Sequence, residues 1–329
     1  MGRPVLRTRL CDMLGIEYPI LSAGMGPSLV GEKTGATVEL VVAVSEAGGL
    51  GIISANACWD AKGELRDNLR WQIRLARELT AKPFGVNITV MDPSSRALVE
   101  VVVEEKVPVV TTSAGNPATY TSYFKENGVK VLHVVASCRH ATGAEKRGVD
   151  AVIAEGYEAG GHNGLDELST FVLVPQVVDA VKAPVVAAGG IADARGYVAA
   201  LALGAEGVQM GTRFIATKEC CAHPAYKQMV LEALDTGTVI TGRKIGPTRG
   251  LRNAFTARMQ EMEAQGASGE EMETFIGWGR TRAGQLQGDL EQGELYCGAI
   301  AGAIGEIVGA GEVMRSIVQG AGEVLAGLR

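Results

Sequence analysis

Short apolar runs alternate with longer amphipathic stretches along the first part of the chain. The apolar runs are rich in β-branched residues and end in Gly, Asn, Ser or Met, which is typical of buried strands. The intervening stretches repeat apolar residues at helical spacing, as in 65–79, 97–105, 171–181 and 194–203. We therefore predict eight strands, at 19–25, 49–55, 83–88, 107–112, 129–135, 150–154, 183–190 and 207–211.

Eight successive strand–helix units are typical of the α/β class and of a (β/α)8, or TIM, barrel, whereas an open doubly wound sheet more often closes after about five or six strands. We expect residues 1–217 to form this barrel. Barrel enzymes carry their functional residues on loops at the carboxyl ends of the strands, and often bind phosphate after strands seven and eight.

The alternation stops after Phe214. Residues 251–290 are charged and helix-prone. We predict that residues 218–296 form a smaller, largely helical substrate or lid subdomain over the barrel mouth. Residues 297–329 place Gly, Ala, Ile and Val at helical spacing, which predicts C-terminal helices that return to the barrel and close it. Small residues in this tail favour close helix packing, namely Gly298, Gly302, Gly305 and Gly309.

Composition and charge narrow the classes of partner. The chain has 329 residues, 47% hydrophobic and only 5% aromatic, so its core rests on Val, Ala, Leu and Ile. A net charge of −6 without a Lys/Arg run disfavours nucleic acid and anionic membranes. The start lacks a signal peptide and no apolar stretch is long enough to span a bilayer, so we expect a cytoplasmic protein. The six Cys residues lack zinc-site spacing, which favours reduced thiols and no metal.

The most informative stretch is 155–164, Glu-Gly-Tyr-Glu-Ala-Gly-Gly-His-Asn-Gly, directly after the sixth predicted strand. Its glycines would let the backbone approach a flat or phosphorylated ligand. His162 at the end of the turn would be suited to proton chemistry, because the pKa of histidine lies near neutrality. Taken alone, the stretch fits a helix-starting loop with a surface histidine equally well.

Two further loops follow predicted strands seven and eight. Gly189-Gly190 and Gly211-Thr212 each place backbone N–H groups beside a helix start, which can hold phosphate without a cation. Each loop alone could be a simple tight turn. Together, at these two positions in the strand order, they favour a phosphorylated ligand.

The expected mouth of the barrel is poor in carboxylates and has neither a Ser-His-Asp arrangement nor a metal-ligand cluster. Hydrolases and metalloenzymes are therefore disfavoured. The mouth instead offers backbone groups, small residues, the Asn87 amide and one imidazole, which suits a planar cofactor that performs a redox step itself.

Several motifs, in this order, resemble the nitronate monooxygenase (2-nitropropane dioxygenase) family of FMN-binding barrels, which includes the FMN-dependent enoyl-acyl-carrier-protein reductase of type II. The resemblance covers almost the whole chain. Its motifs are Tyr-Pro-Ile at 18–20, Ala-Gly-Gly-Leu-Gly at 47–51, Lys-Pro-Phe-Gly-Val-Asn at 82–87, Gly-Asn-Pro at 115–117, Glu-Ala-Gly-Gly-His at 158–162, Ala-Ala-Gly-Gly-Ile-Ala-Asp at 187–193 and Gly-Thr-Arg-Phe at 211–214.

Within the family, the segments 218–219, 222–227 and 288–293 resemble the enoyl reductase branch more than the nitronate branch. Two features depart from that branch. The loop 26–36 is longer than reductases usually have, and Ala299 stands where the family more often has Gln. The substrate therefore stays open at this point.

The resemblance implies a residue for each part of FMN, and His162 over the reactive face of the ring as the catalytic group. The phosphate would be held by Gly189, Gly190, Gly211 and Thr212. The edge of the isoalloxazine would lie along Ala23, Gly24 and Met25. The ring or the ribityl chain would contact Asn87, Glu155, Ala159, Gly160 and Gly161.

This resemblance implies a flavin-dependent oxidoreductase acting on a small molecule. The favoured activity is NAD(P)H-dependent reduction of an α,β-unsaturated (enoyl) thioester, with NADH and NADPH both open. One alternative is a nitronate monooxygenase that oxidises alkyl nitronates with O2, and another is a non-flavin phosphate-binding barrel. A homodimer through the helical subdomain also stays open.

Several other side chains receive structural interpretations. We expect His133 in the core or near the mouth and His140 on a helix surface, while His223 and the tryptophans would be structural. Cys220 and Cys221 are interpreted as ordinary thiols. Arg213 could either help to bind phosphate or cap a helix.

Overall fold

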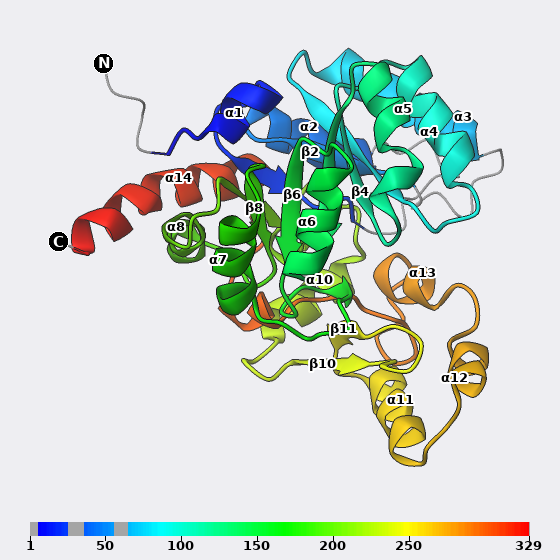
Figure 1. The fold of residues 1–329 in the computed structure, drawn as a ribbon. Coiled ribbons are helices and arrows are strands. Elements are labelled where there is room, and N and C mark those ends of the chain that lie inside the picture. Colours follow the sequence, from blue (N-terminus) through cyan, green and yellow to red (C-terminus); the bar gives the residue numbers. More distant parts are fainter. Residues whose placement is uncertain (1–5, 26–35, 56–64, 329) are drawn as a thin grey trace.

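Eight parallel strands form the centre of the fold, and helices surround them (Figure 1). The computed structural model describes residues 6–25, 36–55 and 65–328, so the predicted long loop 26–36 lies almost wholly outside the described residues. The (β/α)8 barrel is confirmed. Its strands are β1 (Ile20–Ser22), β2 (Gly51–Ser54), β3 (Phe84–Thr89), β4 (Val109–Ser113), β5 (Lys130–Val135), β6 (Ala151–Glu155), β8 (Val185–Ala188) and β9 (Gly207–Met210).

The sheet order is β1-β9-β8-β6-β5-β4-β3-β2, and its two edges meet. Leu21 forms a parallel bridge with Leu50, just before β2. The Leu50 N–H donates to the carbonyl oxygen of Ile20 at 3.0 Å, and the Ser22 N–H donates to that of Leu50 at 3.0 Å. Closure therefore brings the carboxyl ends of all eight strands to a single rim.

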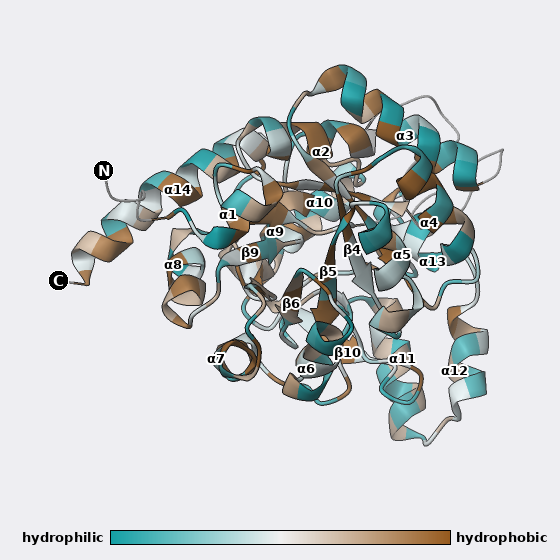
Figure 2. Ribbon diagram, turned by 45° about the horizontal axis from the view of Figure 1, so that its top comes forward, coloured by the Kyte–Doolittle hydropathy of each residue, from teal (hydrophilic) through white to brown (hydrophobic). Residues whose placement is uncertain are grey.

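The helices form an outer layer whose hydrophobic faces turn toward the strands (Figure 2). In α3 (Leu65–Leu79), for example, Leu69, Ile73 and Ala76 are buried at helical spacing. The final helix, α14 (Ala310–Gly327), packs against both α8 and α2, so the end of the chain returns to this layer. The other helices of the barrel are α1 (Arg9–Leu14), α2 (Ala36–Glu46), α4 (Ser95–Glu104), α5 (Thr121–Glu126), α6 (Cys138–Lys146), α7 (Thr170–Ala180), α8 (Ala194–Ala202) and α9 (Thr212–Ile215).

The barrel interior is filled by side chains from alternate strand positions. Leu21, Ile52, Val109, Leu132 and Ile153, from five different strands, belong to one buried cluster. A larger cluster joins the opposite faces of the strands to the helices. Because both faces of each strand are buried, the strands are almost continuously apolar, and this is why they could be predicted from the sequence.

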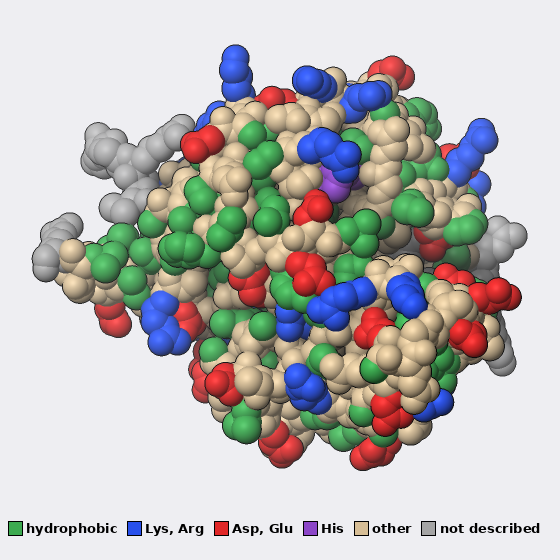
Figure 3. Space-filling model, turned by 60° about the horizontal axis from the view of Figure 1, so that its bottom comes forward, with side chains coloured by type: hydrophobic (Ala, Val, Ile, Leu, Met, Phe, Trp, Pro, Cys, Tyr) green, Lys and Arg blue, Asp and Glu red, His purple; other side chains and the backbone are tan. Residues whose placement is uncertain are grey.

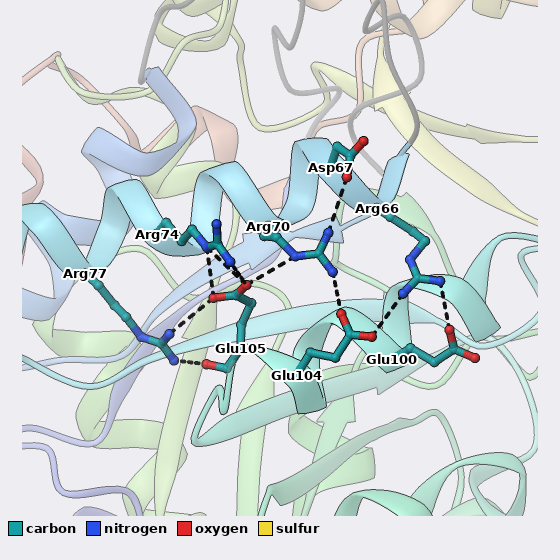
Figure 4. A network of polar contacts seen from close by, with 8 residues as sticks. All are labelled: Arg66, Asp67, Arg70, Arg74, Arg77, Glu100, Glu104 and Glu105. Carbon is teal, nitrogen blue, oxygen red and sulfur yellow. Dashed lines mark hydrogen bonds and ion pairs between the residues drawn. The ribbon is translucent and has the colours of Figure 1, made fainter.

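Helices α3 and α4 are also joined by a network of ion pairs on the outer surface (Figure 4). Glu105 lies at its centre, with Arg74 at 2.8 Å and Arg70 at 3.2 Å from its carboxylate. The hydrogen bond from Arg74 is the main cause that lowers the pKa of Glu105 below its ordinary value. Arg66 extends the network to Glu100 and Glu104.

The region after α9 contains a small sheet that the sequence pattern did not predict. Strands β10 (Thr238–Thr241) and β11 (Thr248–Leu251) pair antiparallel, and β11 also pairs with β7 (Gly161–His162) from the loop after β6. The boundaries 218–296 and 297–329 stay a prediction. The helices of this region are α10 (Pro224–Glu232), α11 (Ala254–Ala264), α12 (Gly269–Ile276) and α13 (Arg280–Gln285).

The tail glycines do not pack helix against helix as the sequence suggested, because they precede α14. A Cβ at Gly298 would lie 2.8 Å from the carbonyl oxygen of Glu158. A Cβ at Gly302, in the short 3-10 helix 299–303, would lie 2.8 Å from the backbone of Leu234. These glycines therefore bring the tail close to loops of the barrel mouth and of the added region.

No helix within the described part of the chain is both long enough and apolar enough to cross a membrane. On the face shown in Figure 3, acidic and basic side chains are interspersed, and no continuous basic surface is seen there.

Candidate active site at the barrel mouth

A cavity of about 1010 Å³ opens at the carboxyl ends of the strands. Seven of the eight barrel strands contribute residues to its wall, and β1 contributes through the loop that follows it, at Ala23, Gly24 and Met25. Gln285, Leu286 and Tyr296 from the added region line it as well. The predicted catalytic residue His162 lines this cavity. So do all the predicted cofactor residues, which are Ala23, Gly24, Met25, Asn87, Glu155, Ala159, Gly160, Gly161, Gly189, Gly190, Gly211 and Thr212.

The two predicted phosphate loops lie side by side. Ala188 at the end of β8 is the register partner of Gln209 in β9, so the glycine turns that follow these strands are neighbours. Gly189 and Gly190 have φ angles of 93° and 72°, which favour glycine. A Cβ at Gly189 would lie 2.8 Å from the carbonyl oxygen of Gly156. The turn thus requires glycine for both its conformation and its packing.

The tail supports the second of these turns. Thr212 is buried, and its hydroxyl oxygen accepts a hydrogen bond of 2.9 Å from the Gly298 N–H. Sequence reasoning placed Thr212 at the phosphate but did not connect it to the tail. The wall beside the turn is therefore made by segments that are far apart in the chain.

Another part of the cavity wall is built around Gly24 and Asn87. A Cβ at Gly24 would lie 2.4 Å from the Cβ of Asn87, so the first loop passes Asn87 with no room for a side chain. The Asn87 Oδ1 accepts a hydrogen bond of 2.9 Å from the Thr111 hydroxyl. Since this bond orients the amide, the Nδ2 group is the donor left for a ligand. Thr111 was not identified from the sequence.

Two buried polar atoms in the cavity wall have no partner in the described part of the chain. They are Oε1 of Gln209 in β9 and Oδ1 of Asn163, which follows His162. Leaving a buried acceptor unsatisfied costs on the order of 1–3 kcal/mol. A ligand with N–H or O–H donors would satisfy them, and together with the glycine cradle they fit a flavin mononucleotide.

His162 lies at the cavity in an exposed position. It belongs to β7, where it is the register partner of Thr248 in β11. The Tyr296 ring meets the imidazole edge to face, with the ring centroids 5.8 Å apart. Gly161 has a φ of 81°, so the turn before the histidine requires glycine. The imidazole is thus held by a strand pairing and a ring contact, and neither of these was predicted.

The same loop carries two glutamates in different environments. Glu158 accepts hydrogen bonds from the backbone N–H of Thr170 at 2.9 Å and from its hydroxyl at 3.0 Å, which tie the loop to α7. Glu155, at the end of β6, is half-buried and has no hydrogen bond to its carboxylate from the described residues. Burial raises the pKa of Glu155 to about 7. This carboxyl group can therefore hold a proton near neutral pH.

The remaining histidines follow their predicted roles. His133 is buried at the cavity wall with its Nδ1 2.7 Å from the Thr112 hydroxyl, and burial lowers the pKa of His133 to about 4. It is therefore neutral at physiological pH. His223 caps α10 by accepting from the Ala225 N–H at 3.2 Å. His140 lies exposed on α6.

Two structural interpretations change. Arg213 is buried away from the cavity and donates to the carbonyl oxygen of Glu306 at 3.1 Å, so it holds the tail rather than a phosphate. Trp278 was expected to pack, but it is 87% exposed. The described residues contain no group of three or more His, Cys, Asp or Glu that could hold a metal ion.

Comparisons with known proteins agree on one family. The family model for nitronate monooxygenase matches residues 7–98 and 93–320. A probable nitronate monooxygenase of Staphylococcus saprophyticus is 36% identical over 304 residues, covering 78% of this chain and 82% of that protein.

Solved structures extend the similarity. FabK from Thermotoga maritima has 47% identity and a TM-score of 0.90, and the match covers 99% of each chain. A nitroalkane oxidase from Streptomyces ansochromogenes has 26% identity and a TM-score of 0.79, covering 97% of this chain and 99% of that one.

The raised pKa of Glu155 predicts a pH-dependent effect on stability. A carboxyl group with a folded pKa of about 7 binds more protons in the folded state, so its contribution is favourable at low pH and is lost as the pH rises through that value. Glu155→Gln removes this titration, so it should favour the folded state more at pH near 8 than at pH near 5. We expect its effect on the free energy of unfolding of the flavin-free protein to be about 1 kcal/mol more stabilising at the higher pH. Urea unfolding at the two pH values measures this difference.

Glu158→Gln is the matched control, because that carboxylate is held by Thr170 in the folded protein. It should lower stability at the higher pH rather than raise it. If Glu155→Gln changed stability equally at both pH values, the proposed protonation of Glu155 would be wrong.

Proposed function

Because this chain belongs to the nitronate monooxygenase family, we propose that it uses FMN and NAD(P)H to reduce an α,β-unsaturated thioester. Membership of this family makes it a flavin-dependent oxidoreductase. The observation that carries the finer proposal is the match to FabK, a type II enoyl-acyl-carrier-protein reductase, at 47% identity over 99% of both chains. The hypothesis of a non-flavin barrel has no support among these relatives.

The residues that would hold FMN divide the cavity into two parts. The turns at Gly189-Gly190 and Gly211-Thr212 would take the phosphate through backbone N–H groups. The loop at Gly24 and the Asn87 amide would lie along the ring, and Gln209 would accept a hydrogen bond that the described residues leave unmade. The chemistry that FMN supplies when bound is hydride transfer from the reduced nicotinamide to the β-carbon of the thioester.

The protein would position a proton donor for the other half of this addition. Reduction of the double bond also needs a proton at the α-carbon, and the His162 imidazole at the cavity is the candidate to deliver it. Its contact with Tyr296 limits the orientations of the ring. Tyr296 is half-buried, and burial raises the pKa of its phenol, so it stays neutral and is a poor proton donor beside His162.

The residues that overhang the mouth would exclude water from the reacting atoms. Gln285, Leu286 and Tyr296 line the cavity from the side of the added region. The hydroxyl of Tyr226, a buried residue of α10, donates to the carbonyl oxygen of Tyr296, which fixes this cover to the helix. A drier site strengthens the hydrogen bonds that orient the substrate.

Oxidation of alkyl nitronates with O2 is the second candidate function. It is favoured by the 36% identity to a probable nitronate monooxygenase and by the structural match to a nitroalkane oxidase. In that reaction His162 would lie beside the α-carbon of the substrate, which in a nitronate has already lost its proton. The same cavity and cofactor residues serve both candidates, so only turnover separates them.

An assay panel on flavin-loaded protein tests the choice. We expect yellow protein that releases FMN on denaturation and oxidises NADH or NADPH faster when a crotonyl thioester is added. Absorbance at the nicotinamide band and an oxygen electrode would be recorded together, with and without thioester and nitronate. Oxygen uptake with a nitronate, without any thioester-stimulated oxidation of NAD(P)H, would instead support the monooxygenase.

His162→Ala should retain FMN and lower turnover by about 10²-fold, the usual scale for loss of a general acid or base. The reason is that the other described histidines that line the cavity lie elsewhere. His133 is in β5 and buried, and His140 is on α6. Steady-state kinetics and flavin absorbance measure the two effects. Tyr296→Phe keeps an aromatic ring beside the histidine and should retain turnover within about threefold. Full activity in His162→Ala would remove the histidine from the mechanism.

A further inference from the structure

Helix α6 presents a row of basic side chains to the cavity. Arg139, His140 and Arg147, here called the α6 basic face, are exposed and line the cavity wall. His140 and Gly143 lie within α6 and Arg147 caps its C-terminus, and their spacing of three and four residues places them on one side of the helix. Neither the FMN residues nor the proton donor described above uses this face.

The middle of the α6 basic face is open. A Cβ at Gly143 would meet no atom within 4 Å. Glycine inside a helix is less favourable than alanine, so helix stability does not explain its presence. The small residue leaves free space between the side chains of His140 and Arg147, where a ligand group could lie against the helix.

The two arginines of this face have no ion-pair or hydrogen-bond partner for their guanidinium groups in the part of the chain that is described. The arginines between α3 and α4 differ, since Arg66, Arg70 and Arg74 all contact carboxylates in the network of Figure 4. Positive charges left unpaired beside a cavity attract an anion.

The carboxylates of the cavity wall do not neutralise this charge. Among the described residues that line the cavity, only Glu155 and Glu158 are acidic. Glu158 accepts hydrogen bonds from Thr170, and burial raises the pKa of Glu155 to about 7, which reduces its negative charge. The α6 side of the cavity is therefore basic although the whole chain carries a net charge of −6.

This face is also distinct from the expected FMN phosphate site. Helix α6 follows β5, whereas the two glycine turns follow β8 and β9, and β6 lies between β5 and β8 in the sheet. One FMN molecule has a single phosphate, which the glycine turns would already hold. A second phosphate-bearing molecule would therefore be the ligand of α6.

We propose that the α6 basic face binds the phosphate of a coenzyme-type substrate whose reactive end enters the cavity. The proposal rests on the proposed function, which requires two such substrates. Guanidinium groups bind phosphate through paired charge-assisted hydrogen bonds, which suits Arg139 and Arg147. Two sources share this chemistry, the pyrophosphate of NAD(P)H and the phosphates of a coenzyme A or phosphopantetheine thioester.

Equilibrium binding to the FMN-loaded protein tests the site without turnover. The probes are ADP-ribose, which carries the pyrophosphate of the dinucleotide, and coenzyme A, each titrated by calorimetry. The test protein is a double variant that carries both Arg139→Gln and Arg147→Gln. Lys146→Gln is the matched control, because Lys146 is exposed on the same helix and does not line the cavity. All three side chains are exposed, so the variants should fold.

We expect one of the probes to bind the wild-type protein. The double variant should weaken the affinity for that probe by about tenfold or more, while Lys146→Gln should change the affinity by less than about twofold. The probe that responds identifies the source of the phosphate. Failure of both probes to bind, or equal binding by wild type and double variant, would overturn the proposal. Binding is measured without turnover, so a failure of this site can be distinguished from a failure of the proposed reductase activity.

Kinetics give a second readout if thioester reduction is observed. If coenzyme A is the source, the double variant should raise the KM for crotonyl-coenzyme A about tenfold. The KM for crotonyl-N-acetylcysteamine, a thioester without phosphate, should stay unchanged. If the dinucleotide is the source, the KM for NAD(P)H should rise instead. An equal rise for the phosphate-free thioester would show a general defect of the cavity and contradict phosphate binding.

Discussion

The structure depends on the parallel pairing of eight strands into a closed barrel, because this pairing places every strand end at one rim. Neighbouring strands are fixed in register by backbone hydrogen bonds, so the loops that follow them become neighbours too. The partnership of Ala188 with Gln209 brings the turns at Gly189 and Gly211 together, although about twenty residues separate them. The cavity is a consequence of this geometry, and its chemistry depends on which short loops meet there.

The loop that carries His162 is held from three sides. Glu158 ties it to the start of α7 through Thr170, and β7 pairs with β11 of the added region. Gly298 of the tail passes so close that a Cβ there would lie 2.8 Å from the Glu158 carbonyl oxygen. The proposed role of His162 as a proton donor requires a narrow range of positions, and the barrel, the added region and the tail all contribute to that constraint.

The sequence was sufficient for features that depend on local pattern. The strands were found because burial on both faces makes them continuously apolar, and α3 was predicted at its observed bounds, Leu65–Leu79. The glycine turns were found because their order along the chain gives their order around the barrel.

Features that depend on tertiary contacts were missed. The two-residue strand β7 carries no periodicity, and the contacts of Tyr296 with His162 and of Thr111 with Asn87 join distant segments. The unpaired state of Arg139 and Arg147 is likewise visible only once the ion pairs of the other arginines are known.

The most direct measurement is the FMN content of Gly189→Ala, with Gly128→Ala as the control. Both glycines have left-handed φ angles, 93° and 75°, so both substitutions strain the backbone. Only at Gly189 would the new methyl also meet other atoms, including the backbone of the loop after β6, since nothing lies within 4 Å at Gly128. If adjacent glycine turns hold the phosphate, the folded Gly189→Ala protein should lose FMN while Gly128→Ala retains it, as judged by flavin absorbance per protein. Full FMN content in Gly189→Ala would contradict this account of the site.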